Sequence, residues 1–595
     1  TMIAQRLEGL RSAMARNKID IYIIPSIDPH NSEYVPEVWQ RRAWISNFTG
    51  SQGEVVITSN DALLWTDGRY FLSASMQLDN KLFKLMKQKG FIPETEEWLK
   101  QYCCGKTVAI DPKLISVAKA SRYEQIITTY GGKLLFLEQN LVDSVKTAMG
   151  EQLLLPKSAM YTLDTKYCGE NSGAKLTKLR QAMASMDAQY FTTNILDEIA
   201  WLLNIRGSDI DYNPLVICNL IISESLGYLF IDKSKISDEI EKYLQQINIS
   251  CFEYELFAEY LNKIDGNILI DENTVNYWIF NQIQNKEQVV FAKSPIILAK
   301  ACKNEIELTN IKTAHINDAF AVIKFLAWLD ANWNKGQTEI SCAQRLLELR
   351  QEQSNFICPS FNTISGFGTN SAIIHYAVNQ QTNKVVDNTQ IYLLDSGGQY
   401  LEGTTDITRT IHLGEPTAEQ KINYTLVLKG HLALARATFP HGTKGENLDV
   451  LARMFLWSNY KDYNHGTGHG VGAFLCVHEG PQRISQANSN VALLPGMIIS
   501  NEPGFYIDGQ YGIRIENLVA VSNDNSTESK NSIFNAFYNF TNLTLVPYCK
   551  KLIDFNLLTN EEIKQIKLYY AEIATTILPN LDQATQNWVI KEMDI

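Results

Sequence analysis

The segment HGTGHGVGAFLCVHEGP, residues 465–481, concentrates side chains that can bind metal ions and move protons. It holds His465, His469 and His478, three of the nine histidines of the chain. Four glycines surround His469 and would let the backbone pass close to a crowded site without a side-chain clash. We therefore expect His469 to be a metal ligand and the two flanking histidines to line the substrate side of the site. Taken alone, the segment fits a set of structural histidines equally well.

Four acidic residues end or interrupt apolar strand patterns in the same part of the chain. Asp395 ends the run IYLLD, Asp406 comes eleven residues later, Glu502 ends MIISNE, and Glu516 lies in IRIEN. Taken alone, each acid is compatible with an ordinary role: capping a turn, lying in solvent or pairing with a lysine. Together they would be too costly to bury without compensating charge, and Arg514 is the only cation in IRIEN.

Two divalent cations would supply the missing positive charge. An oxygen-rich donor set with a single imidazole suits Mn²⁺ and related ions, and bridging carboxylates hold two such ions about 3.5 to 4 Å apart. The residues therefore predict a dinuclear metal-dependent hydrolase.

The elements that must position these residues belong to the last of three predicted domains, residues 301–595. It opens with two long helical patterns, and seven of the nine histidines fall between residues 375 and 478. Strands IYLLD and RTIHL then precede helices over 418–439 and 446–460, and MIISNEPGF and YGIRIENLVAV are predicted as strands. This alternation favours an α+β core around a mainly antiparallel sheet.

The first half of the chain contains a repeated pattern. Residues 44–51 and 201–208 both read W-x-x-N-x-x-G-S, and each stretch lies between a helical pattern and a pair of strands. Four matched positions are few enough to arise by chance, but the matching flanks favour duplication. We predict two copies of one α/β domain, over residues 1–140 and 141–300.

Composition excludes several functional classes. At 595 residues the chain is too long for a single core, and its net charge of −12 disfavours binding to nucleic acid. Ten cysteines without a C-x-x-C pair fit a reducing compartment. The charged first twenty residues do not resemble a signal peptide, and no apolar stretch is long enough to span a membrane. We expect a cytoplasmic protein without membrane or nucleic-acid partners.

With these residues assembled, the chain resembles the Xaa-Pro aminopeptidases (aminopeptidase P) of the long, three-domain cytosolic type. The resemblance covers nearly the whole chain and implies two creatinase-N-like α/β domains followed by a catalytic domain with the pita-bread fold of creatinase and methionine aminopeptidase. It is carried by an ordered set of motifs: SEYVPEVWQRRAWISNFTGS, WTDGRYF, LDEIAWLLNIRGSDIDYNP, IIHYA, YLLDSGGQYLEGTTDITRT, HGTGHGVG, VHEGP, NEPGFY and GIRIEN.

The resemblance implies a set of five metal ligands. They are Asp395, Asp406, His469, Glu502 and Glu516, and all five are present. By the same resemblance Asp406 and Glu516 bridge two ions, Asp395 binds one of them, and His469 with Glu502 binds the other. The metal that the family usually holds is manganese.

The resemblance also implies the reaction, which is removal of the N-terminal residue from a peptide with proline in second position. A hydroxide between the two ions attacks the scissile carbonyl, and Glu502 handles its proton. His375 and His478 contact the substrate backbone and stabilise the oxyanion, and His465 shapes the proline side. Arg514 orients a carboxylate. The substrates implied are peptides that begin with Xaa-Pro, and a homodimer is expected.

The chain departs from the usual family pattern at two places. Val378 stands where relatives commonly have proline, and the SGGQY glycine pair differs from the more usual SGAQY, so the loop beside His375 and the substrate preference could differ.

Three other functions are compared with this one. A prolidase shares the metal ligands but cleaves dipeptides, and a methionine aminopeptidase shares the catalytic fold but needs no N-terminal copies. A non-catalytic binding protein on the same fold would lack the metal.

Overall fold

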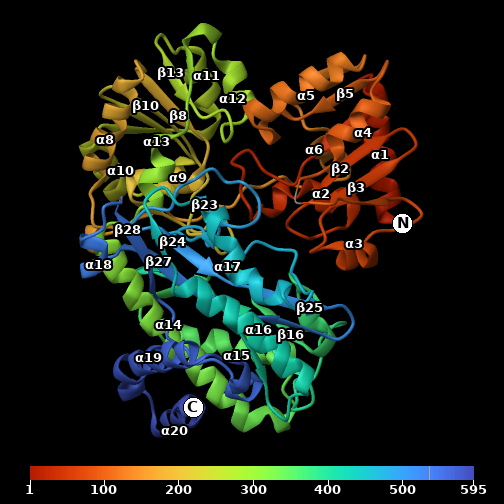
Figure 1. The fold of residues 1–595 in the computed structure, drawn as a ribbon. Coiled ribbons are helices and arrows are strands. Elements are labelled where there is room, and N and C mark those ends of the chain that lie inside the picture. Colours follow the sequence, from red (N-terminus) through yellow and green to blue (C-terminus); the bar gives the residue numbers. More distant parts are fainter. Residues whose placement is uncertain (91, 535) are drawn as a thin grey trace. The chain divides into compact units, whose positions relative to one another are not determined.

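The computed structural model describes residues 1–90, 92–534 and 536–595 (Figure 1). The chain divides into two compact units. One comprises residues 1–162 and 170–296, and the other comprises residues 163–169 and 297–595. The second unit contains all the residues that the sequence predicts for the metal site.

The first unit contains two six-stranded sheets with the same arrangement. Their strand orders are β4-β3-β2-β1-β5-β6 and β12-β11-β10-β8-β13-β14. In each sheet three consecutive strands pair antiparallel and the outer strands add in parallel. The strands are β1 (Ile21–Ile24), β2 (Glu54–Thr58), β3 (Ala62–Thr66), β4 (Lys84–Lys87), β5 (Thr107–Ile110), β6 (Lys133–Phe136), β8 (Tyr190–Thr193), β10 (Asn219–Ser223), β11 (Gly227–Phe230), β12 (Ile249–Phe252), β13 (Ile268–Ile270) and β14 (Val289–Phe291). The two copies of one α/β domain are thereby confirmed.

The repeated sequence pattern has the same structural role in both copies. Helix α2 (Arg41–Ser46) ends at Asn47 with φ 67°, and helix α9 (Leu196–Leu203) ends at Asn204 with φ 51°. Both asparagines are in the left-handed region, which few residues other than glycine and asparagine tolerate at a helix end. The shared Asn therefore terminates the helix in each copy.

The second unit is built on helices and antiparallel strands, as predicted. Its six-stranded sheet has the order β21-β28-β27-β24-β22-β23, and every pairing in it is antiparallel. A three-stranded sheet has the order β16-β17-β20. Strands of these two sheets include β16 (Ile364–Phe367), β21 (Thr438–Pro440), β22 (Gly468–Gly470), β23 (Glu479–Ile484) and β28 (Phe537–Asn542).

Four helices of this unit lie where the sequence predicts them. They are α14 (Glu305–Asn332), α15 (Glu339–Gln351), α16 (Ala418–Ala435) and α17 (Gly445–Trp457). Helix α16 is shorter than predicted because residues 438–440 form strand β21, which ends in a proline. None of the helices among the described residues is long and apolar enough to cross a membrane.

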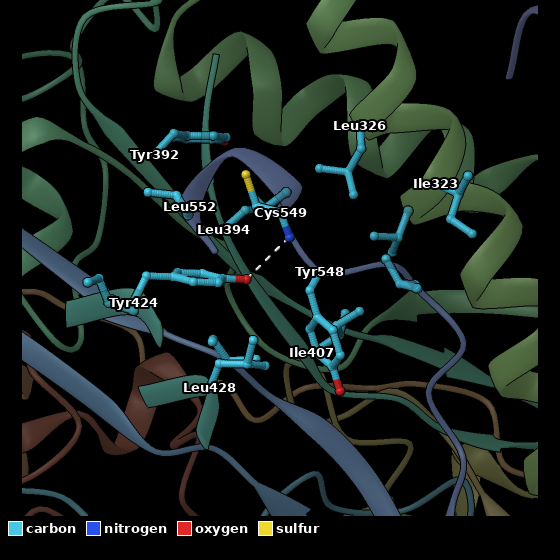
Figure 2. Close-up of a cluster of buried hydrophobic side chains, with 14 of the residues drawn as sticks. Ile323, Leu326, Tyr392, Leu394, Ile407, Tyr424, Leu428, Tyr548, Cys549 and Leu552 are labelled. Carbon is cyan, nitrogen blue, oxygen red and sulfur yellow. Dashed lines mark hydrogen bonds between the residues drawn. The ribbon is translucent and has the colours of Figure 1, made fainter. Parts of the chain in front are cut away.

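The main core of the second unit packs against strands β17 (Ile391–Ser396) and β20 (Ile407–His412), as Figure 2 shows. Tyr424 of α16 accepts a hydrogen bond from the Cys549 backbone N–H at 3.2 Å across this core. Because core side chains are closely packed, the two strands are held rigidly. The labelled core residues are Ile323, Leu326, Tyr392, Leu394, Ile407, Tyr424, Leu428, Tyr548, Cys549 and Leu552.

Two predicted strands are each broken in the structure. MIISNEPGF forms β24 (Ile498–Asn501) and β25 (Gly504–Ile507), and YGIRIENLVAV forms β26 (Tyr511–Arg514) and β27 (Asn517–Asn523). Strands β24 and β27 pair in the six-stranded sheet, while β25 and β26 form a separate two-stranded sheet. Pro503 cannot donate to a ladder and lies at one break. Glu502 and Glu516 therefore lie at the bend between two sheets.

Candidate metal centre

Four of the five predicted ligands come together in the second unit. One donor atom from each of Asp406, His469, Glu502 and Glu516 lies within 4.8 Å of the others. The Nε2 atom of His469 is 3.3 Å from Oδ2 of Asp406 and 3.3 Å from Oε2 of Glu502. Asp406 precedes β20, His469 is the middle residue of β22, and the two glutamates lie at the bend. The arrangement is that of a cation site with three carboxylates and one imidazole.

Asp395, the fifth predicted ligand, lies near the end of β17 and is nearly buried. One of its oxygens, Oδ2, accepts hydrogen bonds from Nε and Nη2 of Arg514 at 3.1 and 2.9 Å. The other oxygen, Oδ1, is buried and has no hydrogen-bond partner among the described residues. Burial, opposed by Arg514 and reinforced by the charges of Asp406 and Glu502, raises the pKa of Asp395 to about 7. Asp395 is therefore within electrostatic reach of the other acids.

The buried acids lack enough positive charge to be ionised together. Burial and the charges of Asp406, Glu502 and Asp395 raise the pKa of Glu516 well above its ordinary value. The Oε2 atom of Glu516 is buried and has no hydrogen-bond partner in the described part of the chain. Unpartnered buried carboxylate oxygens are costly unless a cation or a proton compensates them. The number of buried carboxylates and the chemistry of their oxygen atoms therefore fit divalent cations.

The imidazole of His469 is oriented for metal binding. Its Nδ1 atom lies 2.9 Å from the carbonyl oxygen of Gly470, so that Nδ1 carries the hydrogen and Nε2 faces the carboxylates. Its backbone N–H donates to Oγ of Ser500 at 2.9 Å. Burial lowers the pKa of His469, but the contacts with Asp406 and Glu502 outweigh it and raise the pKa well above the ordinary value.

Two of the four glycines around His469, Gly468 and Gly470, are required by close backbone packing, whereas Gly466 has space for a side chain. A Cβ on Gly468 would lie 2.0 Å from the carbonyl oxygen of Ser500 on β24. A Cβ on Gly470 would lie 2.3 Å from the carbonyl oxygen of Glu479 on β23. Because β22 pairs with both of these strands, its glycines let His469 sit between them.

Arg514 connects Asp395 to a tyrosine that sequence reasoning did not identify. Its Nη1 donates to the hydroxyl of Tyr506 at 2.8 Å, and the same hydroxyl is 2.8 Å from Nε2 of His465. Burial is the main cause that lowers the pKa of His465 to about 4, which leaves the ring neutral at physiological pH. Tyr506 lies in the NEPGFY motif, and nothing in its spacing distinguished it from an ordinary strand residue.

Two more polar residues near the ligands were missed. Thr408 on β20 donates from Oγ1 to Oε1 of Glu516 at 2.8 Å. The carbonyl oxygen of Thr467 accepts the backbone N–H of Glu502 at 2.8 Å. Threonine is common in strands, and its sequence position gave no signal of these contacts.

The two remaining predicted histidines have different relations to the cluster. The ring centroid of His478 is 4.4 Å from that of His469 in an edge-to-face arrangement, and His478 is exposed. A ring nitrogen of His478 also lies within 4.8 Å of donor atoms of Asp406 and His469. His375 follows the short helix η7 (Gly368–Ala372), whose Ser371 accepts a hydrogen bond from the Gly512 N–H at 2.8 Å. The segment before His375 is thereby attached to β26.

Comparison with known proteins accounts for nearly the whole chain. Residues 309–523 match the model of metallopeptidase family M24, and residues 536–594 match its C-terminal region. Residues 6–136 and 152–307 each match a creatinase/prolidase N-terminal domain. A protein of Sordaria macrospora named "Probable Xaa-Pro aminopeptidase P" is 43% identical, with 99% of this chain and 98% of that protein aligned. The chain belongs to the Xaa-Pro aminopeptidase P family of M24 metallopeptidases.

Other aminopeptidase P relatives agree in sequence and in fold. A "Probable Xaa-Pro aminopeptidase P" of Botryotinia fuckeliana is 41% identical, and the alignment includes 99% of this chain and 92% of that protein. The crystal structure of the X-prolyl aminopeptidase from Caenorhabditis elegans superposes with a TM-score of 0.94 at 33% identity, covering 100% of this chain and 99% of that one. That protein is described as a cytosolic enzyme with a di-nuclear active site.

Proposed function

We propose that this chain is a metal-dependent aminopeptidase that removes the N-terminal residue from peptides with proline in second position. One observation carries the proposal. Donor atoms of Asp406, His469, Glu502 and Glu516 converge within 4.8 Å in a chain that aligns over 99% of its length with relatives named for this activity. Buried carboxylates are costly without a compensating cation, so a relative that binds no metal is not expected to retain this group.

We propose that Asp395, Asp406, His469, Glu502 and Glu516 hold two divalent cations, with manganese as the expected ion. The carboxylates offer hard oxygen donors, and the single imidazole offers the nitrogen that Mn²⁺ also accepts. When bound, such a pair of ions lowers the pKa of a water molecule toward neutrality and polarises a carbonyl oxygen. Arg514 keeps one oxygen of Asp395 occupied, so that only the other is offered to a cation.

Protein side chains would supply the proton transfers. Glu502 is the proposed base, since its carboxylate lies at the bend beside Nε2 of His469, at 3.3 Å. Burial raises its pKa, but contacts with Glu516 and His469 outweigh burial and hold the pKa below the ordinary value, which keeps the carboxylate ionised. It would take the proton of the attacking water and pass it to the leaving proline nitrogen. His478 and His375 would donate hydrogen bonds to the carbonyl oxygen and the substrate backbone.

The preference for proline has a physical basis. A peptide bond before proline has no N–H on its leaving nitrogen, and the ring fixes φ, so peptidases that bind the backbone donor lose that contact. His465 and Tyr506 offer aromatic surface for the pyrrolidine ring, and Asp395 is the proposed neighbour of the free α-amine. Binding of this amine would limit cleavage to one residue.

The larger organisation is also proposed. We infer domains over 1–140, 141–300 and 301–595, a homodimer in solution, and a cytosolic location like that given for the Caenorhabditis elegans enzyme. Small-angle scattering gives the mass in solution, and a monomeric mass would refute the dimer.

The test of activity uses metal-stripped protein with and without added Mn²⁺. We expect manganese-dependent release of alanine from Ala-Pro-Ala and little action on the dipeptide Ala-Pro. Preference for the dipeptide would identify a prolidase, and inactivity on both peptides despite bound metal would indicate a binding protein.

Glu502→Gln in its metal-loaded form should lower kcat by roughly 10²- to 10⁴-fold if Glu502 is the base. A kcat near that of the unmodified protein would contradict this role.

A further inference from the structure

Helix α17 carries a charge pair that is buried instead of exposed. Asp449 and Arg453 are four residues apart, and each is 2% exposed. Nε of Arg453 donates to Oδ2 of Asp449 at 2.7 Å. Acid–arginine pairs at this spacing are ordinarily solvent-exposed and contribute little. A buried arginine must instead have its other donors satisfied, so its remaining contacts indicate what it holds in place.

The rest of the guanidinium holds the backbone that leads to His465. Nη1 donates to the carbonyl oxygen of Tyr463 at 2.7 Å and to Oδ1 of Asp462 at 2.9 Å. Nη2 donates to the carbonyl oxygen of His465 itself at 2.8 Å. A planar guanidinium fixes such acceptors in one geometry, which a lysine cannot reproduce. Arg453 therefore sets the position of the His465 backbone.

A series of rings continues from Arg453 to the site. The guanidinium carbon lies 3.8 Å from the ring centroid of Tyr463, and that ring is 4.8 Å from the ring of His465. His465 is in turn 5.5 Å from the ring of Tyr506, edge to face. Arg453 thus contacts the His465 backbone directly and the His465 ring through Tyr463. Tyr506, to which Arg514 also donates, is a second aromatic neighbour of that ring.

The acid of the pair reaches the backbone of a proposed ligand. Oδ1 of Asp449 accepts the Thr467 hydroxyl hydrogen at 2.6 Å, and that hydroxyl lies 2.6 Å from the hydroxyl of Tyr463. The carbonyl oxygen of Thr467 accepts the N–H of Glu502 at 2.8 Å. The same charge pair is therefore connected to two parts of the site, the ring of His465 and the bend that carries Glu502.

Given the aminopeptidase activity proposed above, we propose that Arg453 is a positioning residue that holds the His465 ring against the proline of the substrate and so sets the preference for proline after the scissile bond. A ring held between two tyrosines presents a fixed, neutral aromatic surface, which suits the apolar pyrrolidine ring. If its anchor is lost, His465 can shift, and contacts with proline weaken more than contacts with alanine at the same position.

The test compares binding of the product dipeptide Pro-Ala and of its alanine analogue Ala-Ala, as competitive inhibitors of Ala-Pro-Ala hydrolysis by the full chain with saturating Mn²⁺. The variants are Arg453→Met and Arg453→Lys, the second of which keeps a cation beside Asp449. We expect both to raise the inhibition constant of Pro-Ala by about tenfold while that of Ala-Ala changes by less than about twofold. A change limited to stability would leave both constants unaltered.

Arg350→Met is the matched control. Arg350 is also 2% exposed, and it donates to both oxygens of Asp318 at 2.8 and 3.2 Å, but within the described part of the chain neither residue of this pair contacts His465. It should lower the melting temperature without changing either inhibition constant. Equal effects on both dipeptides, no effect of Arg453→Lys, or loss of folding in both Arg453 variants would overturn the positioning role. Absence of cleavage by the unmodified, metal-loaded protein would instead refute the proposed function.

Discussion

Arg514 directs two of its side-chain hydrogen bonds to the same oxygen of Asp395, with Nε at 3.1 Å and Nη2 at 2.9 Å. A bidentate pair would ordinarily use both carboxylate oxygens. Here Oδ1 stays without a hydrogen-bond partner among the described residues and is buried. This asymmetry neutralises one side of the carboxylate and leaves the other side available to a cation.

We expect Arg514→Lys to weaken metal binding. Lysine cannot reach Asp395 and Tyr506 together, so the carboxylate loses its fixed orientation. The expected loss is roughly 10- to 100-fold in Mn²⁺ affinity or activity, measured by titrating metal-free protein with Mn²⁺ and following hydrolysis of Ala-Pro-Ala. Arg350→Lys, at a buried pair with Asp318, is the control and should leave the titration unchanged. An unaltered Mn²⁺ titration of the Arg514 variant would show that Arg514 does not orient Asp395 for metal binding.

The metal-free protein should lose stability as pH rises. The pKa of Asp395 is raised to about 7 in the folded state, against about 3.9 for an unfolded chain. A raised folded-state pKa contributes stability that is present below the unfolded pKa and is lost as pH rises through the folded value. Between about pH 5 and pH 8 the melting temperature should therefore fall by roughly 2 °C or more relative to Asp395→Asn, which cannot titrate.

Added Mn²⁺ should reverse this trend, because the ion replaces the proton and its binding is favoured at higher pH. Scanning calorimetry of both proteins at several pH values, with and without Mn²⁺, measures the effect. Parallel pH profiles for the metal-free protein and Asp395→Asn would show that Asp395 does not titrate in this range.

His478→Ala should lower kcat more than it alters KM. The ring of His478 lies 4.4 Å from that of His469 and is exposed. Because the ring is exposed, its removal should not disturb folding, and the variant reports on its contact with the substrate oxygen. Loss of an oxyanion contact lowers kcat by roughly 10²- to 10³-fold, because the contact is formed in the transition state. His441→Ala is the control, since Nδ1 of His441 contacts the Tyr538 hydroxyl at 2.8 Å. Should KM alone rise in the His478 variant, the residue binds substrate without assisting the reaction.

Gly468→Ala should be much more destabilising than Gly466→Ala. A Cβ at Gly468 would lie 2.0 Å from the Ser500 carbonyl oxygen, whereas at Gly466 the nearest atom is 3.6 Å away. Forcing β22 away from β24 should cost roughly 1–3 kcal/mol in the free energy of unfolding. Denaturant melts of the two variants provide the comparison. Equal stability would mean that the strands separate without cost.

Several features could be predicted from the sequence because they depend on local chemistry. His469 stood out by its flanking glycines, and the acids stood out because they end or interrupt apolar strands. The repeated W-x-x-N-x-x-G-S pattern predicted two copies of one domain, since Asn47 and Asn204 end a helix in the same left-handed conformation. Residue type and spacing of this kind act within a few positions, where backbone geometry alone constrains the result.

Only the tertiary structure decided which polar residues connect. Asp395 and Arg514 are 119 positions apart, and Thr408 and Glu516 are 108 apart, so no spacing rule relates them. Asp449 and Arg453 have the spacing of a surface ion pair, and only packing against the chain that leads to His465 makes the pair a buried anchor. The sequence by itself predicted the donors of the proposed metal site and determined the duplicated domains. Strand pairing and burial determined their partners, because long-range contacts depend on how the whole core closes.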